Sequence, residues 1–390
     1  MTLDKTKNNL NVPPLRFPGF EGEWKKTTLG EITTNFNLRN KEQIDYPMFS
    51  VTNNRGFIPQ SEQFEDREMK GEDIKAYKVI HHNDFAYNPA RINVGSIAKY
   101  NGYEPCMISS LYVCFKANNE VNEDWLMHLL RTPKVQYYYQ LNGEGGVRIY
   151  LFYPNFARIR TSIPSIEEQK KIAKILSIID ERIATQNKII NDLKKLKSAI
   201  IDKLYSEVKG ETCRYSELFT VVTERNNKRI YNTVIAASQE LGMVERESLN
   251  LKVQFDENSI NTYKIINSGD YVIHLRSFQG GFAFSRLQGI CSPAYVILRP
   301  NDRVAYSYFE NYFTSSKFIN SLRLVTYGIR DGRSINVEEW LSMKVILPSK
   351  DEQKHIIQTV QSIQNKIANE ANILFRLQLQ RNFFLDTMFI

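Results

Sequence analysis

The sequence predicts an α+β protein in which two tandem-repeat α/β domains are separated by two long helices that form an antiparallel coiled coil. Two observations predict this fold. The decapeptide I-P-S-I-E-E-Q-K-K-I at 163–172 returns as L-P-S-K-D-E-Q-K-H-I at 347–356. Each copy is preceded by short alternating strands with turns and followed by apolar residues spaced three and four apart. A recurrence at a fixed offset indicates an internal duplication.

Further matches extend the duplication over most of the chain. In each, the second copy lies 183 to 186 positions after the first and the order is kept. The matched pairs are Y-K-V-I-H-H-N-D-F at 77–85 with Y-K-I-I-N-S-G-D-Y at 263–271, F-S-V-T-N-N-R-G-F-I at 49–58 with I-A-A-S-Q-E-L-G-M-V at 235–244, and W-L-M-H-L-L-R-T-P-K at 125–134 with Y-F-E-N-Y-F-T-S-S-K at 308–317. The predicted parts are domain 1 at 1–164, a helix at 165–209, domain 2 at 210–348 and a helix at 349–390.

Composition sets wide limits on function. A chain of 390 residues is too long for one ordinary domain, and its 42% of hydrophobic residues is enough to form two hydrophobic cores. The net charge of +8 hints at a polyanionic partner, but the four predicted parts carry only +2, +3, +2 and +1. The four cysteines form no C-x-x-C pair, so we expect reduced thiols and no metal site. The sequence shows neither a signal peptide nor a membrane span, so we expect no membrane partner and a cytoplasmic protein.

The repeated decapeptide has the signature of a helix start. Pro164 and Pro348 end the preceding strands. Ser165 and Ser349 follow, each with a glutamate three residues later, which is the S-x-x-E pattern of a capping box. Each copy therefore predicts a helix that begins at a defined residue.

Both helices carry a seam typical of a coiled coil. Its positions are three and four residues apart, and most are apolar. In the first helix they are Ile172, Leu176, Ile179, Ile183, Gln186, Ile190, Leu193, Lys197, Ile200 and Leu204. In the second they are Ile356, Val360, Ile363, Ile367, Glu370, Leu374, Leu377 and Arg381. Two equivalent repeats related by a two-fold axis would place the seams antiparallel.

Two registers are open for this pairing. In the first, residue i of one helix faces residue 567 − i of the other, so Lys197 meets Glu370 and Gln186 meets Arg381. In the second, the paired numbers sum to about 560. That register buries more apolar length but leaves Lys197 near Ile363.

Two similar domains joined by long helices, each helix opening with [IL]-P-S-x-x-E-Q, resemble the specificity (S) subunits of type I restriction-modification systems. The run N-V-P-P-L-R-F-P-G-F-E-G-E-W-K-K-T-T-L-G-E-I at 11–32 is similar to the start of that family. The resemblance implies a bacterial, nucleoid-associated protein whose two target-recognition domains each read one half of a bipartite site in double-stranded DNA. It implies that the helices fix the spacer between half-sites and hold two methyltransferase (M) subunits, and that restriction/translocase (R) subunits join the complex.

The resemblance also implies a non-catalytic chain. It places AdoMet on the M partner and ATP with Mg on the R partner, with no cofactor on this chain. The sequence agrees, because Asn88-Pro89-Ala90 lacks the second proline and the aromatic of an adenine methyltransferase motif. Gly143-Glu144-Gly145-Gly146 has no G-K-[ST] after it and is not a P-loop. No catalytic residue is predicted.

Polar loops that differ between the repeats are the candidate DNA contacts, because base edges are read by Arg, Asn, Gln and Ser side chains. Three loop classes qualify in each domain. In domain 1 the candidates are Asn53, Asn54, Arg55, Arg91, Asn93 and Arg148. In domain 2 they are Ser238, Gln239, Arg276, Ser277, Gln279, Arg330 and Arg333.

Two other functions are alternatives. A stand-alone DNA-modifying enzyme would need a methyltransferase or nuclease motif, which the sequence lacks. A coiled-coil protein scaffold would explain the helices but not two large domains with divergent loops.

Overall fold

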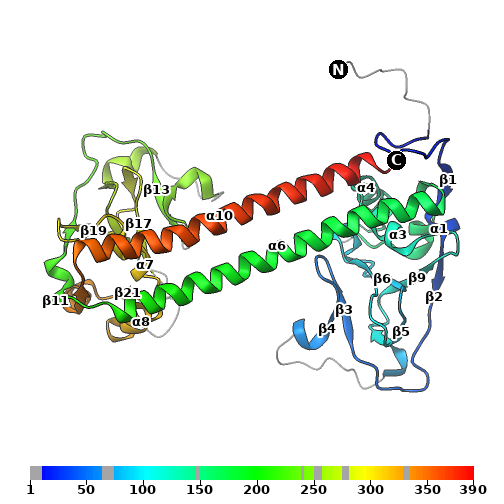
Figure 1. Cartoon of the computed structure of the whole chain (residues 1–390), viewed down its shortest axis with the longest axis horizontal. Coiled ribbons are helices and arrows are strands. Elements are labelled where there is room, and N and C mark those ends of the chain that lie inside the picture. The colour runs from blue at the N-terminus through cyan, green and yellow to red at the C-terminus, as the bar shows by residue number, and fades with distance from the viewer. Residues whose placement is uncertain are drawn as a thin grey trace, which may run out of the picture. The chain divides into compact units, whose positions relative to one another are not determined.

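The computed structural model describes residues 11–63, 74–145, 149–238, 241–249, 257–274, 281–327 and 334–390 (Figure 1). The chain forms two compact units, each containing one α/β domain and parts of both long helices. Unit 1 comprises Met1–Asn187 with Ile373–Ile390, and unit 2 comprises Lys188–Asn372.

Unit 1 is built on a four-stranded antiparallel sheet of order β2-β9-β6-β7, with three two-stranded ribbons β1-β10, β3-β4 and β5-β8. The strands are β1 (Lys25–Thr28), β2 (Thr33–Phe36), β3 (Phe49–Thr52), β4 (Gly56–Pro59), β5 (Lys78–Ile80), β6 (Phe85–Tyr87), β7 (Ile97–Lys99), β8 (Cys106–Ile108), β9 (Val113–Ala117) and β10 (Arg160–Ile163).

The helices of unit 1 begin at residues suited to capping. Thr28 accepts a hydrogen bond from the Glu31 amide, Asn122 from Trp125, and Thr132 from Val135. The short helices are α1 (Leu29–Ile32), α2 (Gln60–Gln63), α3 (Glu123–Leu129), α4 (Pro133–Asn142) and α5 (Tyr153–Ala157), with 3₁₀ turns η1 (Ile74–Ala76) and η2 (Ile92–Val94).

Unit 2 repeats the strand topology of unit 1. Its four-stranded sheet has the order β12-β19-β16-β17, and its ribbons include β11-β22, β13-β14 and β15-β18. The strands are β11 (Glu211–Arg214), β12 (Phe219–Val222), β13 (Ile235–Ser238), β14 (Gly242–Glu245), β15 (Lys264–Ile266), β16 (Tyr271–Ile273), β17 (Phe282–Phe284), β18 (Gly289–Cys291), β19 (Val296–Pro300), β20 (Thr326–Tyr327), β21 (Ser334–Ile335) and β22 (Lys344–Leu347). The short helices are α7 (Tyr308–Tyr312), α8 (Ser316–Ser321) and α9 (Val337–Ser342), with 3₁₀ turns η3 (Tyr215–Glu217), η4 (Arg246–Leu249), η5 (Glu257–Thr262) and η6 (Leu322–Leu324). The predicted tandem repeat of α/β domains is confirmed.

Both faces of each four-stranded sheet are buried. Phe85 and Tyr87 of β6 pack in one hydrophobic cluster, and Ala86 between them packs in another. In β16 of unit 2, Tyr271 and Ile273 pack in one hydrophobic cluster and Val272 packs in another. Successive side chains of a strand point to opposite faces, so each sheet lies between two apolar layers.

The two long helices are continuous (Figure 1) and start where the decapeptides predict. They are α6 (Ile166–Glu207) and α10 (Lys350–Thr387). The serine half of each capping box is present: Ser165 Oγ accepts from the Glu168 amide at 3.4 Å, and Ser349 Oγ accepts from the Glu352 amide at 3.3 Å.

The Glu168 carboxylate has a different role from the one predicted for a capping box. Arg16 donates to both of its oxygens, at 2.8 and 2.7 Å, and the Glu168 side chain is 1% exposed. The repeat therefore uses one glutamate of the decapeptide to fix the chain's N-terminal segment onto α6. A buried bidentate pair of this kind is strong and geometrically specific.

The glutamine of the decapeptide is a buried clamp. Gln169 is fully buried; its Oε1 accepts from the Asn122 amide at 2.8 Å, and its Nε2 donates to the carbonyls of Glu120 and Pro164 at 3.1 and 3.0 Å. It thus joins the start of α6 to the strand before it and to the loop that leads into α3.

Gln353 reproduces this clamp in unit 2. Its Oε1 accepts from the Ala305 amide at 2.7 Å, and its Nε2 donates to the carbonyls of Arg303 and Pro348 at 3.1 and 3.0 Å. The two copies make the same three bonds, so the conserved glutamine of the repeat has a structural role.

The helices pack antiparallel within each unit, in the second of the two predicted registers. In unit 2, Lys197 Nζ donates to Gln364 Oε1 at 3.5 Å. In unit 1, Arg381 pairs with Asp180. Both pairs sum to 561, and each is the counterpart of the other in the duplication.

The register that pairs Lys197 with Glu370 is therefore wrong. Gln364 and Glu370 are six residues apart, about 9 Å along a helix. Glu370 instead forms an ion pair with Lys366, one turn earlier on its own helix. Long cationic side chains can leave an apolar seam to reach partners at its edge, so the polar seam residues need not face one another. Burial lowers the pKa of Lys197, and the Glu310 carboxylate opposes that shift.

All the predicted seam positions are buried or half-buried, while most of their helical neighbours are exposed. The ends of the long helices contact the hydrophobic cores of the domains. In unit 1, Phe389, which lies just after the end of α10, stacks on Trp125 of α3, with ring centroids 6.0 Å apart. In unit 2, Tyr205 of α6 donates to the carbonyl of Tyr308 at 2.7 Å. Each domain is thus packed against the end of one long helix and the start of the other.

A buried histidine lies beside the ion pair of unit 1. His128 is 6% exposed, and its Nδ1 lies 4.0 Å from Asp180 Oδ2. Burial is the main cause that lowers the pKa of His128 to about 4; Asp180 and Asp124 oppose it, while Arg381 and Arg131 add to it. The imidazole is therefore neutral at pH 7, and its approach to Asp180 is not an ion pair.

We expect this histidine to make the protein less stable in acid. Its folded-state pKa lies below the unfolded value near 6.5, so the stability it contributes is complete above pH 6.5 and is lost as the pH falls towards 4. At pH 5 the loss is about 2 kcal/mol, and urea unfolding of His128→Gln should show a correspondingly smaller drop between pH 7 and pH 5 than the wild type. His355→Gln, at an exposed position of α10, is the control. Equal drops in wild type and His128→Gln would contradict the assignment.

Among the described residues, no helix is long and apolar enough to cross a membrane.

Candidate nucleic-acid interface

The first candidate loop is the tight turn between β3 and β4. Thr52 Oγ1 accepts from the Arg55 amide and donates to the Gly56 carbonyl, both at 3.1 Å, and Gly56 has a φ of 68°. Asn53, Asn54 and Arg55 are exposed at its tip. The Arg55 guanidinium pairs with Glu62 of α2, so the two asparagines are the freer side chains of this turn.

The second candidate loop joins β6 to β7 and lies against the first. Ser96 Oγ donates to the Val51 carbonyl at 2.8 Å, and a Cβ on Gly95 would lie 3.3 Å from the Asn53 carbonyl. Gly95 has a φ of 96°, so this close approach needs glycine. Arg91 is exposed and Asn93 is half-buried. The structure thus brings the first two predicted loops of domain 1 together.

The described residues that follow the third predicted loop contact the second loop. The Leu151 amide donates to the Pro89 carbonyl at 3.0 Å, which joins the segment after the third loop to the second loop. Arg148 itself lies outside the described residues. The adjacent Tyr150 and Phe152 are stacked, with ring centroids 6.2 Å apart, and both are exposed.

In unit 2 fewer residues of the candidate interface are described. Ser238 Oγ accepts from the Leu241 amide at 3.3 Å at the turn between β13 and β14. The start of β14 packs on β17, because a Cβ on Gly242 would lie 2.8 Å from the Phe284 carbonyl. The other predicted residues of domain 2 lie outside the described residues: Gln239, Arg276, Ser277, Gln279, Arg330 and Arg333.

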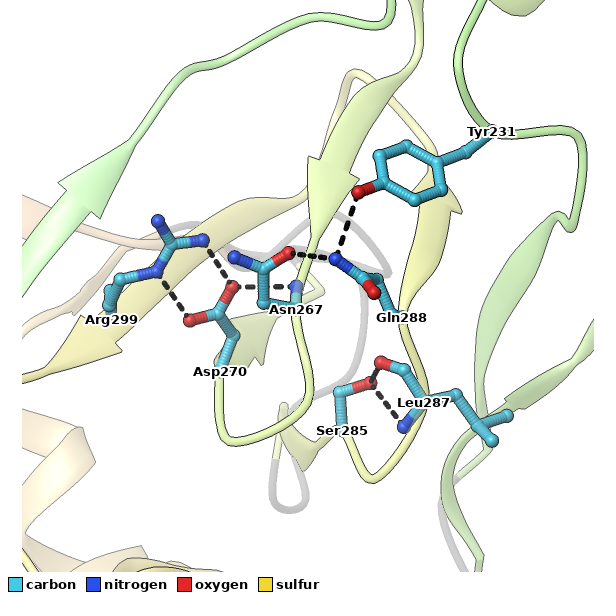
Figure 2. Close-up of polar contacts among 7 residues, drawn as sticks. All are labelled: Tyr231, Asn267, Asp270, Ser285, Leu287, Gln288 and Arg299. Atoms are coloured by element: carbon cyan, nitrogen blue, oxygen red, sulfur yellow. Dashed lines mark hydrogen bonds and ion pairs between the residues drawn. The ribbon is translucent and has the colours of Figure 1, made fainter.

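A buried carboxylate holds the turn before the β6 or β16 strand in both units. Asp84 accepts from the His81 amide at 2.8 Å, and Asp270 accepts from the Asn267 amide at 2.9 Å. Burial raises the pKa of Asp84. Figure 2 shows Arg299 donating hydrogen bonds to both carboxylate oxygens of Asp270; their lengths are 2.9 and 2.8 Å. With both oxygens engaged in its own fold, Asp270 is a structural residue.

Sequence reasoning missed a loop that both units share. The dipeptide Arg39-Asn40 returns as Arg225-Asn226, with the offset of 186 seen elsewhere in the repeat. That dipeptide was the signal available in the sequence. In unit 2 the exposed residues after it include two cations, Lys228 and Arg229.

Nothing in the described residues forms a metal site. No group of three or more His, Cys, Asp or Glu side chains comes together there. The four cysteines are buried and unpaired. Burial raises the pKa of Cys106, Cys114 and Cys291 to about 12, so these thiols stay protonated.

Comparison with known proteins gives a consistent result. Residues 21–195 match the model of the family described as Type I restriction modification DNA specificity domain. The chain is 23% identical to a protein named as the MjaX specificity subunit of a type I restriction enzyme from Methanocaldococcus jannaschii, over 89% of this chain and 91% of that protein. It is 25% identical to the MjaVIII specificity subunit from the same organism, over 67% and 68%.

Solved structures share the fold. One comes from work on the structural basis of complex assembly and conformational transition of the type I R-M system. Its TM-score is 0.59 at 16% sequence identity, and the match covers 96% of this chain and 99% of that one. Another is the S subunit of a type I restriction-modification system from M. genitalium, with a TM-score of 0.56, 13% identity, and coverage of 97% and 99%. Residues 21–195 thus match the type I DNA specificity domain family, and the whole chain shares its fold with solved chains of type I restriction-modification systems.

Proposed function

We propose that this chain is the non-catalytic, sequence-reading subunit of a type I restriction-modification complex, and that each of its two domains reads one half of a bipartite DNA site. The observation that carries the proposal is the pair of units with one topology and different loops. A shared frame fixes where the loops lie, and divergent loop side chains would give each half-site its own sequence.

The proposal assigns roles to the parts of the chain. Domain 1 at 1–164 and domain 2 at 210–348 are the recognition domains. The helices at 165–209 and 349–390 set the spacer and hold two M subunits, which bind AdoMet and methylate adenine. R subunits use ATP and Mg to restrict unmodified DNA. The complex acts in the cytoplasm, on the DNA of the nucleoid.

The test is to express the chain with its cognate methyltransferase in a host that lacks restriction-modification systems, and to map methylated adenines by sequencing. We expect one bipartite motif that appears only when both proteins are present. Methylation by the chain alone would show an enzyme in its own right. Absence of any new motif, with the two proteins co-purifying, would instead show a protein scaffold.

Among the described candidates, Arg91 offers the clearest test of base reading. Its side chain is exposed at the start of η2 and has no partner among the described residues. A bidentate arginine–guanine contact contributes about 1–3 kcal/mol of discrimination. We expect Arg91→Ala to relax one position in one half-site of the methylated motif and to leave the other half-site intact.

The same methylation mapping provides the comparison. Arg55→Ala is the matched variant, because Arg55 is already paired with Glu62 and should change the motif less. A uniform loss of methylation at all sites in Arg91→Ala would mark a phosphate contact and contradict base reading.

A further inference from the structure

We propose that the exposed loop at 225–231 of unit 2 binds phosphates of duplex DNA, while its counterpart at 39–45 of unit 1 does not. The inference rests on the proposed function and adds a contact that the three predicted loop classes do not include. It makes the two domains unequal in how they hold DNA.

Both loops are built on a buried asparagine. Asn40 is 3% exposed; its Nδ2 donates to the Ile44 carbonyl at 2.8 Å and its Oδ1 accepts from the Ile44 amide at 3.1 Å. Asn226 is fully buried and makes the same two bonds to Tyr231, at 2.7 and 3.2 Å. One side chain therefore closes each loop into a ring.

The turn inside each ring is also the same. The Gln43 amide donates to the Asn40 carbonyl at 3.1 Å, and the Arg229 amide donates to the Asn226 carbonyl at 2.8 Å. Gln43 and Arg229 have φ values of 59° and 53°, in a region that residues other than glycine rarely occupy. Only a well-determined frame holds such a conformation, so the loop is set before any ligand arrives.

The charges carried by this frame differ between the units. Residues 39–45 contain Arg39, Lys41, Glu42 and Asp45 and sum to zero. Residues 225–231 contain Arg225, Lys228 and Arg229 and no acid, so they sum to +3. All three cations are exposed, and none has an ion-pair partner among the described residues.

In both units the first arginine of the loop lies beside a lysine of the neighbouring strand. Arg225 forms an antiparallel bridge with Lys264 of β15, as Arg39 does with Lys78 of β5. Burial is the main cause that lowers the pKa of Lys264, and the charge of Arg225 lowers it further. The Lys264 ammonium donates to the Tyr295 carbonyl at 2.6 Å, as Lys78 of unit 1 does to the Tyr112 carbonyl, so this cation is common to both units and the charge difference lies in the loops themselves.

Unit 2 fixes the end of its loop with side chains that unit 1 lacks. Figure 2 shows Gln288 Nε2 donating to the Tyr231 hydroxyl at 2.9 Å and to Asn267 Oδ1 at 3.1 Å. Asn267 belongs to the turn that Asp270 holds. At the ring-closing position of Tyr231, unit 1 has Ile44, and at the position of Asn267 it has His81. A loop held in place loses less entropy on binding.

Phosphate is the ligand that fits these side chains. The loop carries three exposed cations and no acidic residue, which matches the negative charge that every phosphate of the DNA backbone carries. Duplex DNA presents such anions at regular spacing, and each contact releases counterions. In unit 1, the carboxylates of Glu42 and Asp45 would repel the same backbone.

The test measures how DNA binding depends on salt. The full chain is titrated against a fluorescent mixed-sequence duplex of about 40 base pairs at several salt concentrations, and the slope of log Kobs against log[salt] is determined. Arg225→Gln, Lys228→Gln and Arg229→Gln should each lower the slope by about 0.9, and the triple variant by about 2 to 3. Glutamine already occupies the left-handed position of the unit 1 loop, so Arg229→Gln keeps a side chain that this frame accepts.

Lys41→Gln in the unit 1 loop is the matched control and should leave the slope unchanged. The triple variant, supplied with its methyltransferase, should still methylate the wild-type motif, because phosphate contacts carry no base preference. An unchanged slope, an equal effect of Lys41→Gln, or a relaxed half-site would each overturn the proposal. Loss of methyltransferase co-purification with an unchanged slope would show that the loop binds protein. Failure of the wild-type chain to bind DNA would refute the proposed function itself, and is thus distinct from these results.

Discussion

Gln169→Leu is expected to lower the free energy of unfolding of unit 1 by about 4 kcal/mol. Leucine fills a similar volume but leaves the Asn122 amide and the carbonyls of Glu120 and Pro164 without partners. Each buried polar group deprived of its hydrogen bond costs about 1–3 kcal/mol. Gln353→Leu should have a similar effect on unit 2. Their effects should add, because the two glutamines share no partner.

Urea unfolding followed by tryptophan fluorescence and circular dichroism measures these losses. Gln358→Leu, at an exposed position on α10, is the control and should lie within about 0.5 kcal/mol of the wild type. If Gln169→Leu were as stable as this control, water or a rearranged loop would be replacing the three bonds, and the clamp would contribute little.

The repeated decapeptide shows how far sequence reasoning reaches. The serine cap follows from local rules, because its partner is an amide three residues away. The roles of Glu168 and Gln169 do not, because their partners are set by tertiary structure. Arg16 lies 152 positions before Glu168, and the Gln169 partners near residue 120 are 47 and 49 positions away. A local pattern predicts where the helix starts, while the contacts that fix it to the domain depend on the whole fold.

The helix register shows a second limit. The 3–4 spacing predicts which residues lie in the seam, and all of those residues are buried or half-buried. Spacing alone cannot choose the alignment, because Lys197 and Arg381 reach Gln364 and Asp180, which lie outside the seam. Pairing polar seam residues with one another was reasonable for short side chains and fails for long ones.

The candidate interface also has a part that the sequence predicts and a part that it does not. The duplication predicts the frame, so the turn with Asn53 and the loop with Arg91 were found as loops and lie together. The loop with Arg229 is not evident from the sequence, because the residue that closes its ring, Asn226, is also a common turn former. Its repetition as Arg-Asn in both halves becomes informative only when the buried amide is seen.

A heptad added to both long helices should lengthen the spacer of the methylated motif by about three base pairs and leave both half-sites unchanged. Each helix starts in one unit and ends in the other, so seven added residues lengthen it by about 10 Å, and base pairs in duplex DNA are about 3.4 Å apart. The insertions belong after Asn187 and after Asn372, where the units divide. Copies of residues 188–194 and 373–379 keep the seam in phase, because they repeat its apolar positions.

Methylation mapping of a host carrying this variant and the cognate methyltransferase gives the result directly. An insertion in α6 alone is the control; it shifts the α6 seam against α10 by one heptad and should reduce methylation instead of producing a new spacer. The loops that read the half-sites are untouched in both variants, so any change in half-site sequence would mean that the helices take part in reading DNA. Retention of the original spacer by the double insertion would mean that the methyltransferase subunits, and not these helices, set the distance between the half-sites. The spacer length therefore separates the geometric role of the helices from the recognition role of the loops.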